Sequence, residues 1–171
     1  MKENSHKTAI SRKRPSMPLR LALEKGFIEG RVLDYGCGRG KDVEHLRNLG
    51  YYSVTGYDPN WFPKLPKGKF DTILCIYVLN VVYDSVRKRI ARDIKNYLKP
   101  GGHLVVAVRS FGDIHKAATK GGWQEYKDGY ITGSRTFQSI ISGFEVNELF
   151  GASMSRWKVS PEFVYFLVKR G

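Results

Sequence analysis

Three glycines at alternate positions, Gly36, Gly38 and Gly40, separate an apolar segment from an amphipathic one. Residues 31–35 predict a buried strand, and the apolar positions after the turn recur at helical spacing until Gly50 ends the pattern. A glycine-rich turn between a strand and a helix N-terminus brings bare backbone close to a ligand. The segment therefore predicts a βα unit that carries a ligand-binding turn.

The spacing of this turn disfavours two common ligand classes. A phosphate-binding P-loop needs a glycine where Tyr35 stands and a Ser or Thr where Asp42 stands. A dinucleotide fingerprint places its third glycine at the position of Lys41. With these two ligand classes disfavoured, the remaining pattern consists of Asp34, the three alternate glycines and a second aspartate, Asp58, at the end of the next predicted strand.

Strands and helices alternate along most of the chain, which predicts an α/β fold with a mostly parallel sheet covered on both faces. The expected strands are residues 31–35, 53–57, 70–78 and 103–108, and the expected helices are 16–26, 41–50 and 84–98. After these we expect a short helix near residues 136–141 and two strands, 144–150 and 163–169, that pair antiparallel. With 171 residues and 42% hydrophobic content, we expect a basic arm at 1–15 and a single domain over 16–171.

Four sequence blocks in order resemble the class I S-adenosylmethionine-dependent methyltransferases. They are the turn from Asp34 to Gly40, the pair Asp58-Pro59, the strand motif at 70–75, and residues 98–104, and they span residues 31–109. The resemblance implies a Rossmann-like sheet that is mostly parallel with a C-terminal antiparallel strand. A closer likeness, in residues 6–12, the glycine turn, Tyr57-Asp58-Pro59 and residues 77–82, is to the putative methyltransferases associated with DNA phosphorothioation.

The pattern departs from the family between Asp58 and Phe70. Only the eleven residues 59–69 separate them, and prolines and a glycine interrupt this segment. A helix and a strand do not fit there, so we expect the usual third strand to be absent, together with the acidic residue that many relatives place near adenine. Trp61 and Phe62 either stack on the base or plug the edge of the shortened sheet.

The resemblance implies a set of residues that bind S-adenosylmethionine. Asp58 suits the ribose, because a carboxylate can accept both hydroxyl hydrogens. Asp34 either meets the ammonium group or only orients the turn, while Cys37 fills space in the turn and Cys75 lines the pocket through its backbone. The full set is Asp34, Tyr35, Gly36, Cys37, Gly38, Gly40, Asp58, Pro59 and Cys75.

Two residues at the C-terminal end of the strand predicted at 70–78, Tyr77 and Asn80, are the catalytic candidates because they are expected to face the methyl acceptor. The alternative is that Tyr77 belongs to the core and Asn80 caps the next helix. No histidine or cysteine spacing indicates a metal site.

The formal net charge of +13 predicts an anionic partner. We expect RNA or DNA to bind through Arg12, Lys13 and Arg14 of the arm and through the insert at residues 111–133, bounded by Phe111 and Gly133. In the insert, Trp123, Tyr126 and Tyr130 alternate with Lys116, Lys120 and Lys127, a mixture that can stack bases and neutralise phosphates.

Two alternatives to a nucleic-acid methyltransferase stay open: an enzyme whose insert closes over a small substrate, and a cofactor-binding accessory subunit without chemistry of its own. The first residues are polar and basic, the longest apolar run is too short to span a membrane, and the two cysteines do not suggest a disulfide framework. We therefore expect a cytoplasmic protein without a membrane partner.

Overall fold

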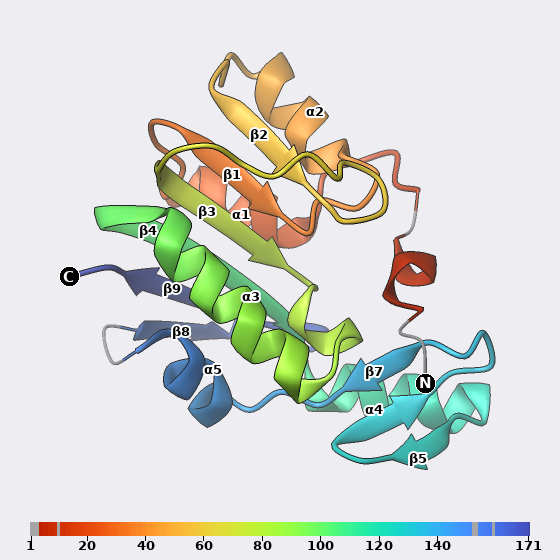
Figure 1. Ribbon diagram of the computed structural model, residues 1–171. Coiled ribbons are helices and arrows are strands. Elements are labelled where there is room, and N and C mark those ends of the chain that lie inside the picture. The colour runs from red at the N-terminus through yellow and green to blue at the C-terminus, as the bar shows by residue number, and fades with distance from the viewer. Residues whose placement is uncertain (1–3, 10, 152–153, 159) are drawn as a thin grey trace.

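The computed structural model describes residues 4–9, 11–151, 154–158 and 160–171, and its main feature is a six-stranded sheet in the order β2-β1-β3-β4-β9-β8 (Figure 1). Strands β2, β1, β3 and β4 pair in parallel, and β9 pairs antiparallel with both β4 and β8. The bounds are β1 Val32–Tyr35, β2 Val54–Tyr57, β3 Phe70–Ile76, β4 Leu98–Arg109, β8 Met154–Lys158 and β9 Phe163–Lys169. The predicted α/β sheet with a C-terminal antiparallel strand is confirmed.

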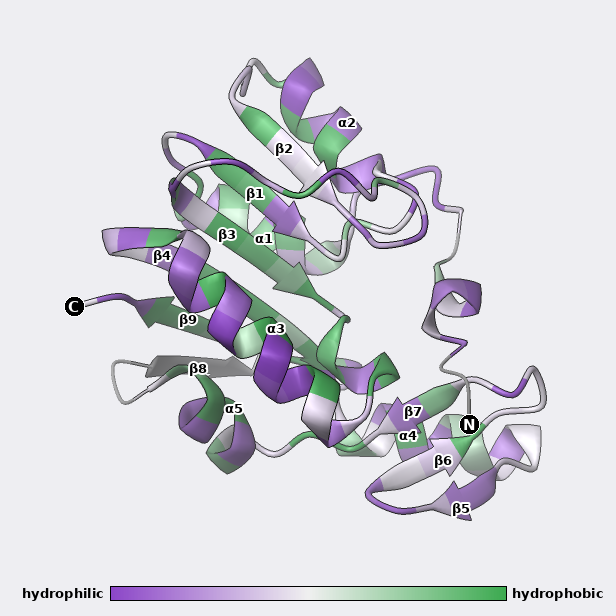
Figure 2. Cartoon of the chain, viewed as in Figure 1, coloured by the Kyte–Doolittle hydropathy of each residue, from purple (hydrophilic) through white to green (hydrophobic). Residues whose placement is uncertain are grey.

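Helices cover both faces of this sheet. Figure 1 shows α3 (Asp84–Tyr97) and α5 (Gly143–Phe150) on one face and α1 (Met17–Glu24) on the other, and α2 (Lys41–Asn48) packs into the same core cluster as α1. Ser16 caps α1, since its side chain accepts a hydrogen bond from the Leu19 backbone at 3.2 Å. In α3 the apolar positions face the sheet and most charged ones face outward, as the alternating colours of Figure 2 show, and Arg87 is the buried exception.

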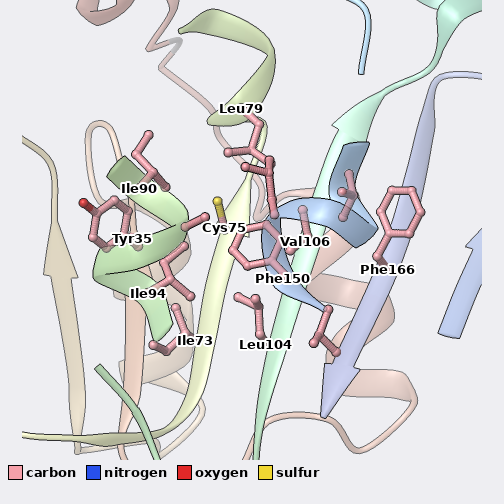
Figure 3. Packing of buried hydrophobic residues seen from close by; sticks show 14 of the residues in the cluster. Tyr35, Ile73, Cys75, Leu79, Ile90, Ile94, Leu104, Val106, Phe150 and Phe166 are labelled. Atoms are coloured by element: carbon pink, nitrogen blue, oxygen red, sulfur yellow. The ribbon is translucent and has the colours of Figure 1, made fainter. Parts of the chain in front are cut away.

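The core consists of two layers because β3 and β4 are buried on both faces. Side chains of alternate residues in a strand point to opposite faces. Ile73 and Cys75 therefore pack toward α3 and α5 (Figure 3), whereas Leu74 and Ile76 pack toward α1 and α2. Each fully buried leucine or isoleucine of this kind stabilises the fold by roughly 1.5–3 kcal/mol relative to an exposed one.

The connection from β2 to β3 contains no strand or helix in residues 59–69, so β2 is the edge strand at this end of the described sheet. An isolated bridge between Asp58 and Phe62 closes the start of the connection, with backbone hydrogen bonds of 3.1 and 2.9 Å. The prediction that the family's third strand is absent is confirmed.

The insert is more regular than expected. It consists of α4 (Phe111–Gly121) and the strands β5 (Gln124–Tyr126) and β6 (Gly129–Ile131), and β7 (Phe137–Ser139) completes a three-stranded antiparallel sheet. A short 3-10 helix, η2 (Leu79–Val81), lies against β7. The helix predicted near residues 136–141 is wrong, because this segment gains its hydrogen bonds by pairing with β6.

The strand predicted at residues 144–150 is also wrong, because this segment is the helix α5. Ser142 caps it by accepting a hydrogen bond from the Glu145 backbone at 3.1 Å. The sixth strand of the main sheet is formed by β8 instead, and β9 agrees with the predicted strand at 163–169. Among the described residues, no helix has both the length and the apolar character needed to cross a membrane.

Candidate active site

A cavity of about 1110 Å³ lies beyond the carboxyl ends of β1, β2, β3 and β4, where open α/β sheets bind their ligands. One end is bordered by the glycine turn and Asp58, and the other end is bordered by Arg109 and the insert. The N-terminal segment forms part of its wall. Of the predicted cofactor-binding residues, the cavity is lined by Tyr35, Gly36, Cys37, Gly38, Asp58 and Pro59.

The glycine turn borders the cavity with bare backbone, and a side chain would clash at one of its glycines and be tight at another. Gly36 has φ +81°, and a Cβ there would lie 2.3 Å from Cγ2 of Val78. Gly38 has φ +53°, and a Cβ there would lie 3.3 Å from Cβ of Ala9. The Gly36 and Cys37 amides donate to the Tyr57 carbonyl at 2.7 and 3.0 Å, which fixes the turn against β2.

Gly40 does not line the cavity and instead begins α2. Its φ is +76°, and a Cβ there would lie 2.8 Å from the ring of Phe62. The neighbouring Trp61 ring lies 4.0 Å from the guanidinium carbon of Arg39. Neither aromatic residue lines the cavity, and their rings lie against Gly40 and Arg39 of the turn, so stacking on a base is not favoured.

Asp58 lies at the rim of the cavity, with its carboxylate held by three backbone amides. Oδ2 accepts from Gly38 at 3.2 Å, and Oδ1 accepts from Asn60 and Trp61 at 2.9 and 3.1 Å. These hydrogen bonds join the glycine turn to the segment after β2. They also fix the direction in which the carboxylate faces the cavity.

Asp34 is buried at 3% exposure and does not line the cavity. Burial, followed by repulsion from Asp42, raises the pKa of its carboxyl well above the ordinary value, although Arg12 opposes this shift. Asp42 is itself buried and accepts from the Ser16 amide at 2.8 Å and from Arg12 at 3.3 Å. The geometry therefore favours the alternative in which Asp34 orients the turn from below.

Neither cysteine has the environment of a reactive thiol. Cys37 lines the cavity, but burial raises the pKa of its thiol, and the negative charges of Asp34 and Asp58 raise it further. Cys75 is fully buried away from the cavity, and burial raises its pKa too. Cys37 fills the space beside Gly56, where a Cβ would lie 3.0 Å from its sulfur.

Tyr77 lines the cavity directly after β3 and has an unusual backbone conformation, with φ +59°. Its amide donates to the Ala107 carbonyl at 2.8 Å, and its ring packs edge-on against Phe163. Burial raises the pKa of its hydroxyl above the ordinary value of 10.0. The side chain therefore stays protonated at neutral pH and can donate a hydrogen bond into the cavity.

Asn80 is fully buried and does not line the cavity. Its Nδ2 donates to the Ser139 carbonyl at 2.9 Å, and its Oδ1 accepts from the Arg109 amide at 2.7 Å. Both ends of the side-chain amide are thus engaged between β4 and β7. This placement favours a role in positioning Arg109 over contact with an acceptor.

The far end of the cavity contains a cluster that sequence reasoning missed. Arg109 forms an ion pair with Asp113 at 2.6 Å and donates to Gln138 at 3.1 Å. Its guanidinium carbon lies 5.9 Å from the Trp123 ring centroid, and all four residues line the cavity. The only sequence signal was the spacing of four between Arg109 and Asp113, which follows the end of a predicted strand.

The N-terminal arm folds over the cavity. Its 3-10 helix η1 (Ser5–Thr8) lines the wall, the Asn4 side chain donates to the Arg135 carbonyl at 3.2 Å, and Arg39 donates to the Ala9 carbonyl at 3.3 Å. Arg12 lines the cavity and pairs with Asp42, so only Lys13 and Arg14 of the three predicted nucleic-acid contacts are exposed. Residues 1–3 and 10 of the predicted arm lie outside the described residues.

The three aromatic residues of the insert do not form one open stacking surface. Trp123 lines the cavity, whereas Tyr126 packs edge-on against Tyr83 and Phe137. The Tyr130 hydroxyl lies 3.3 Å from Nδ1 of His115. Within the described part of the chain, no group of three or more histidine, cysteine or carboxylate side chains is placed to hold a metal ion.

Comparison with known proteins agrees with this geometry. A family model described as a methyltransferase domain matches residues 8–151. No curated protein matches the sequence. The solved structures that share the fold include one from a study of the conversion of a disulfide bond into a thioacetal group during echinomycin biosynthesis (17% identity, TM-score 0.69, covering 91% of this chain and 82% of that one).

Two further structures are similar at the level of fold. The Burkholderia thailandensis 1,6-didemethyltoxoflavin-N1-methyltransferase, solved with its substrate and S-adenosylhomocysteine, is 16% identical with a TM-score of 0.63, covering 99% of this chain and 79% of that one. An S-adenosylmethionine-dependent methyltransferase from Clostridium acetobutylicum is 17% identical with a TM-score of 0.55, covering 90% and 89%. The chain belongs to the methyltransferase domain family, and it is an S-adenosylmethionine-dependent methyltransferase.

Proposed function

We propose that this enzyme methylates a compact acceptor enclosed between Tyr77 and Arg109, with the methyl donor lying along the glycine turn. The observation that carries the proposal is the single cavity of about 1110 Å³ that joins Asp58 at one end to Arg109 at the other. This volume is slightly above the range for small-molecule sites, roughly 300–1,000 Å³. One chamber therefore has room for a donor and an acceptor side by side.

The donor end fits S-adenosylmethionine in two respects. The backbone at Gly36 and Gly38 borders the cavity without side chains, so the methionine part can approach it closely. The Asp58 carboxylate borders the cavity as an acceptor for ribose hydroxyls. When bound there, S-adenosylmethionine supplies an electrophilic methyl group, and the protein's task is to hold the acceptor in line and exclude water.

The acceptor end fits a planar molecule that carries an anionic or hydrogen-bond-accepting group. The Arg109 guanidinium presents N–H donors beside the Trp123 face. Tyr77 supplies a further hydroxyl donor from the end of β3, and Asn80 orients the Arg109 backbone. An acceptor hydroxyl or amine releases a proton on methylation, and the Asp113 and Glu162 carboxylates at this end can receive it.

A second candidate acceptor is nucleic acid, and the charge supports it. The formal net charge is +13, and Lys13, Arg14, Lys116 and Lys120 are exposed. A base would have to leave its stack to enter the cavity beside Trp123. The likeness of the arm and of residues 77–82 to phosphorothioation-associated methyltransferases makes DNA the first nucleic acid to test.

The experiment is incubation with methyl-labelled S-adenosylmethionine and separate pools of RNA, DNA, protein and metabolites. Label in the metabolite pool, unchanged by Lys13→Ala with Arg14→Ala, supports the compact acceptor. Label in DNA or RNA that this double variant reduces supports the second candidate. Asp58→Ala is the matched control, since it should abolish donor binding and labelling in every pool, and donor binding without label in any pool would indicate an accessory subunit.

A further inference from the structure

The cavity extends past Asp58 into a region that the family's third strand and its neighbouring helices would otherwise crowd. Here its wall is formed by one side of α3, from which Val86, Arg89, Ile90 and Asp93 line the cavity. Tyr35 and Tyr57, at the ends of β1 and β2, line the same region. Figure 1 shows α3 in front of β3, and Figure 3 shows Tyr35 beside Ile90 and Ile94 of that helix.

Two tyrosines and one carboxylate form a defined group in this region. The Tyr35 hydroxyl donates to Oδ2 of Asp93 at 3.1 Å, and the Tyr35 and Tyr57 rings lie 5.1 Å apart at an angle of 57°. Tyr35 is buried, while Tyr57 and Asp93 are half-buried. In the described part of the chain, Tyr35 is the only side chain that donates to Asp93, so Oδ1 remains able to accept a hydrogen bond from a ligand.

The group formed by Tyr35, Tyr57 and Asp93 lines the same cavity as Asp58. Tyr57 and Asp58 follow each other at the end of β2, and both line the cavity, with Tyr57 packed on the α3 side of the sheet. With the ribose held at Asp58, the methionine part at the glycine turn and the acceptor at the Arg109 end, the part of the cavity lined by α3 is the part left for the base of a bound nucleoside. The base would then meet a tyrosine ring, the Arg89 side chain and the Asp93 carboxylate.

We propose that Asp93 accepts a hydrogen bond from the exocyclic amino group of adenine, with the base packed against Tyr57, and that α3 thereby replaces the missing third strand. This inference rests on the proposed donor site. The recognition is specific because a carboxylate only accepts hydrogen bonds when ionised. Adenine offers an amino donor at this position, whereas hypoxanthine offers a carbonyl oxygen that the carboxylate repels.

The test is calorimetric titration with S-adenosylhomocysteine and with S-inosylhomocysteine, which differ in that one group. The wild-type protein should bind the adenine compound on the order of tenfold or more tightly, because a site built around a hydrogen bond rejects an analogue that cannot make it. In Asp93→Asn the preference should fall to about threefold or less, since an amide can both donate and accept. Asp84→Asn, on the same helix but exposed and outside this cavity, is the matched control and should keep the wild-type ratio.

The outcomes separate this inference from the proposed donor site. If the wild-type protein binds neither compound, the donor site itself is overturned. If it binds both with equal affinity, or if folded Asp93→Asn keeps the wild-type ratio, only the role of Asp93 is overturned. The wild-type ratio needs no variant, so the inference stays open to refutation even if Asp93→Asn does not fold.

Discussion

Arg87 of α3 forms an ion pair with Glu145 of α5, with Nε and Oε1 2.7 Å apart, although the arginine side chain is only 2% exposed. The same guanidinium pairs with Asp128 in the turn between β5 and β6, and it donates to the Ser139 hydroxyl at 2.8 Å. One buried cation thus holds the small sheet and α5 against the main domain. Its removal leaves two carboxylates without their partner.

We expect Arg87→Leu to destabilise the protein by about 1–3 kcal/mol, because the Glu145 and Asp128 carboxylates that it leaves without a partner are only partly buried, at 26% and 40% exposure. Lys88→Ala is the control, since Lys88 pairs with Asp84 on the exposed face of the same helix, where water and salt screen the pair and leave it little effect on stability. Urea unfolding monitored by circular dichroism measures both. A loss for Arg87→Leu no larger than that of the control would contradict the anchoring role.

The buried Asp34 carboxyl makes stability depend on pH with a definite sign. Its pKa is raised above the ordinary 3.8, chiefly by burial. A group whose pKa is higher in the folded than in the unfolded chain contributes stability that is present below the unfolded pKa and lost as the pH rises through the folded pKa. Asp34→Asn should therefore gain stability relative to wild type as the pH rises above 3.8. The melting temperatures of wild type and Asp34→Asn across that pH range measure this gain. If the advantage of Asp34→Asn shrank with rising pH, the pKa of Asp34 would not be raised in the folded protein.

Gly36→Ala should weaken binding of S-adenosylhomocysteine at least about tenfold and destabilise the fold by roughly 1–3 kcal/mol. The reason is that the new Cβ lies 2.3 Å from Val78 and the backbone keeps φ +81°. Gly50→Ala is a matched control, since its φ is +90° but nothing lies within 4 Å of the new Cβ. Combining Gly36→Ala with Val78→Ala should recover part of the lost affinity and stability. Calorimetric titration measures the affinity, and thermal unfolding measures the stability. Equal losses for Gly36→Ala and Gly50→Ala would show that strain, not the clash, is responsible.

Both cysteine thiols should react slowly with a disulfide reagent at neutral pH. Burial raises the pKa values of both thiols, and the thiolate is the reacting form. Cys37 lines the cavity and should react before Cys75. Bound S-adenosylhomocysteine should slow the reaction of Cys37, because it would cover the glycine turn. Mass spectrometry of the labelled protein assigns the sites, with the urea-unfolded chain as the fast reference. Rapid labelling of Cys75 in the folded protein is the result that would count against the described core.

The sequence was sufficient for those parts of the fold where the pattern is local. The turn from Asp34 to Gly40, the buried strands and the amphipathic α3 were all predictable from glycine spacing and apolar periodicity. The segment 144–150 was wrongly predicted as a strand because Phe144 and Val146 alternate like strand residues. The signal for a helix was Ser142 followed three residues later by Glu145, which is the sequence pattern of a capping box. β7 was unpredictable because its strand conformation depends on pairing with β6.

The candidate site was predictable only where it is continuous in sequence. Tyr35 to Gly38 and Asp58 line the cavity as the motif implies. Arg109, Trp123 and Asp93 come from three separate elements, and only packing brings them to one chamber. Asn80 was a candidate from the sequence but does not line the cavity, because its side-chain amide bonds backbone groups of Ser139 and Arg109 instead.

The arm contacts both ends of the cavity, through Asn4 at Arg135 and through Ala9 at Arg39. The same short segment thus borders the end of the cavity proposed for the donor and the end proposed for the acceptor. With both molecules placed as proposed, their two binding sites share one stretch of wall. A substitution that detaches this segment, such as Asn4→Ala, is therefore expected to change the binding of both molecules together.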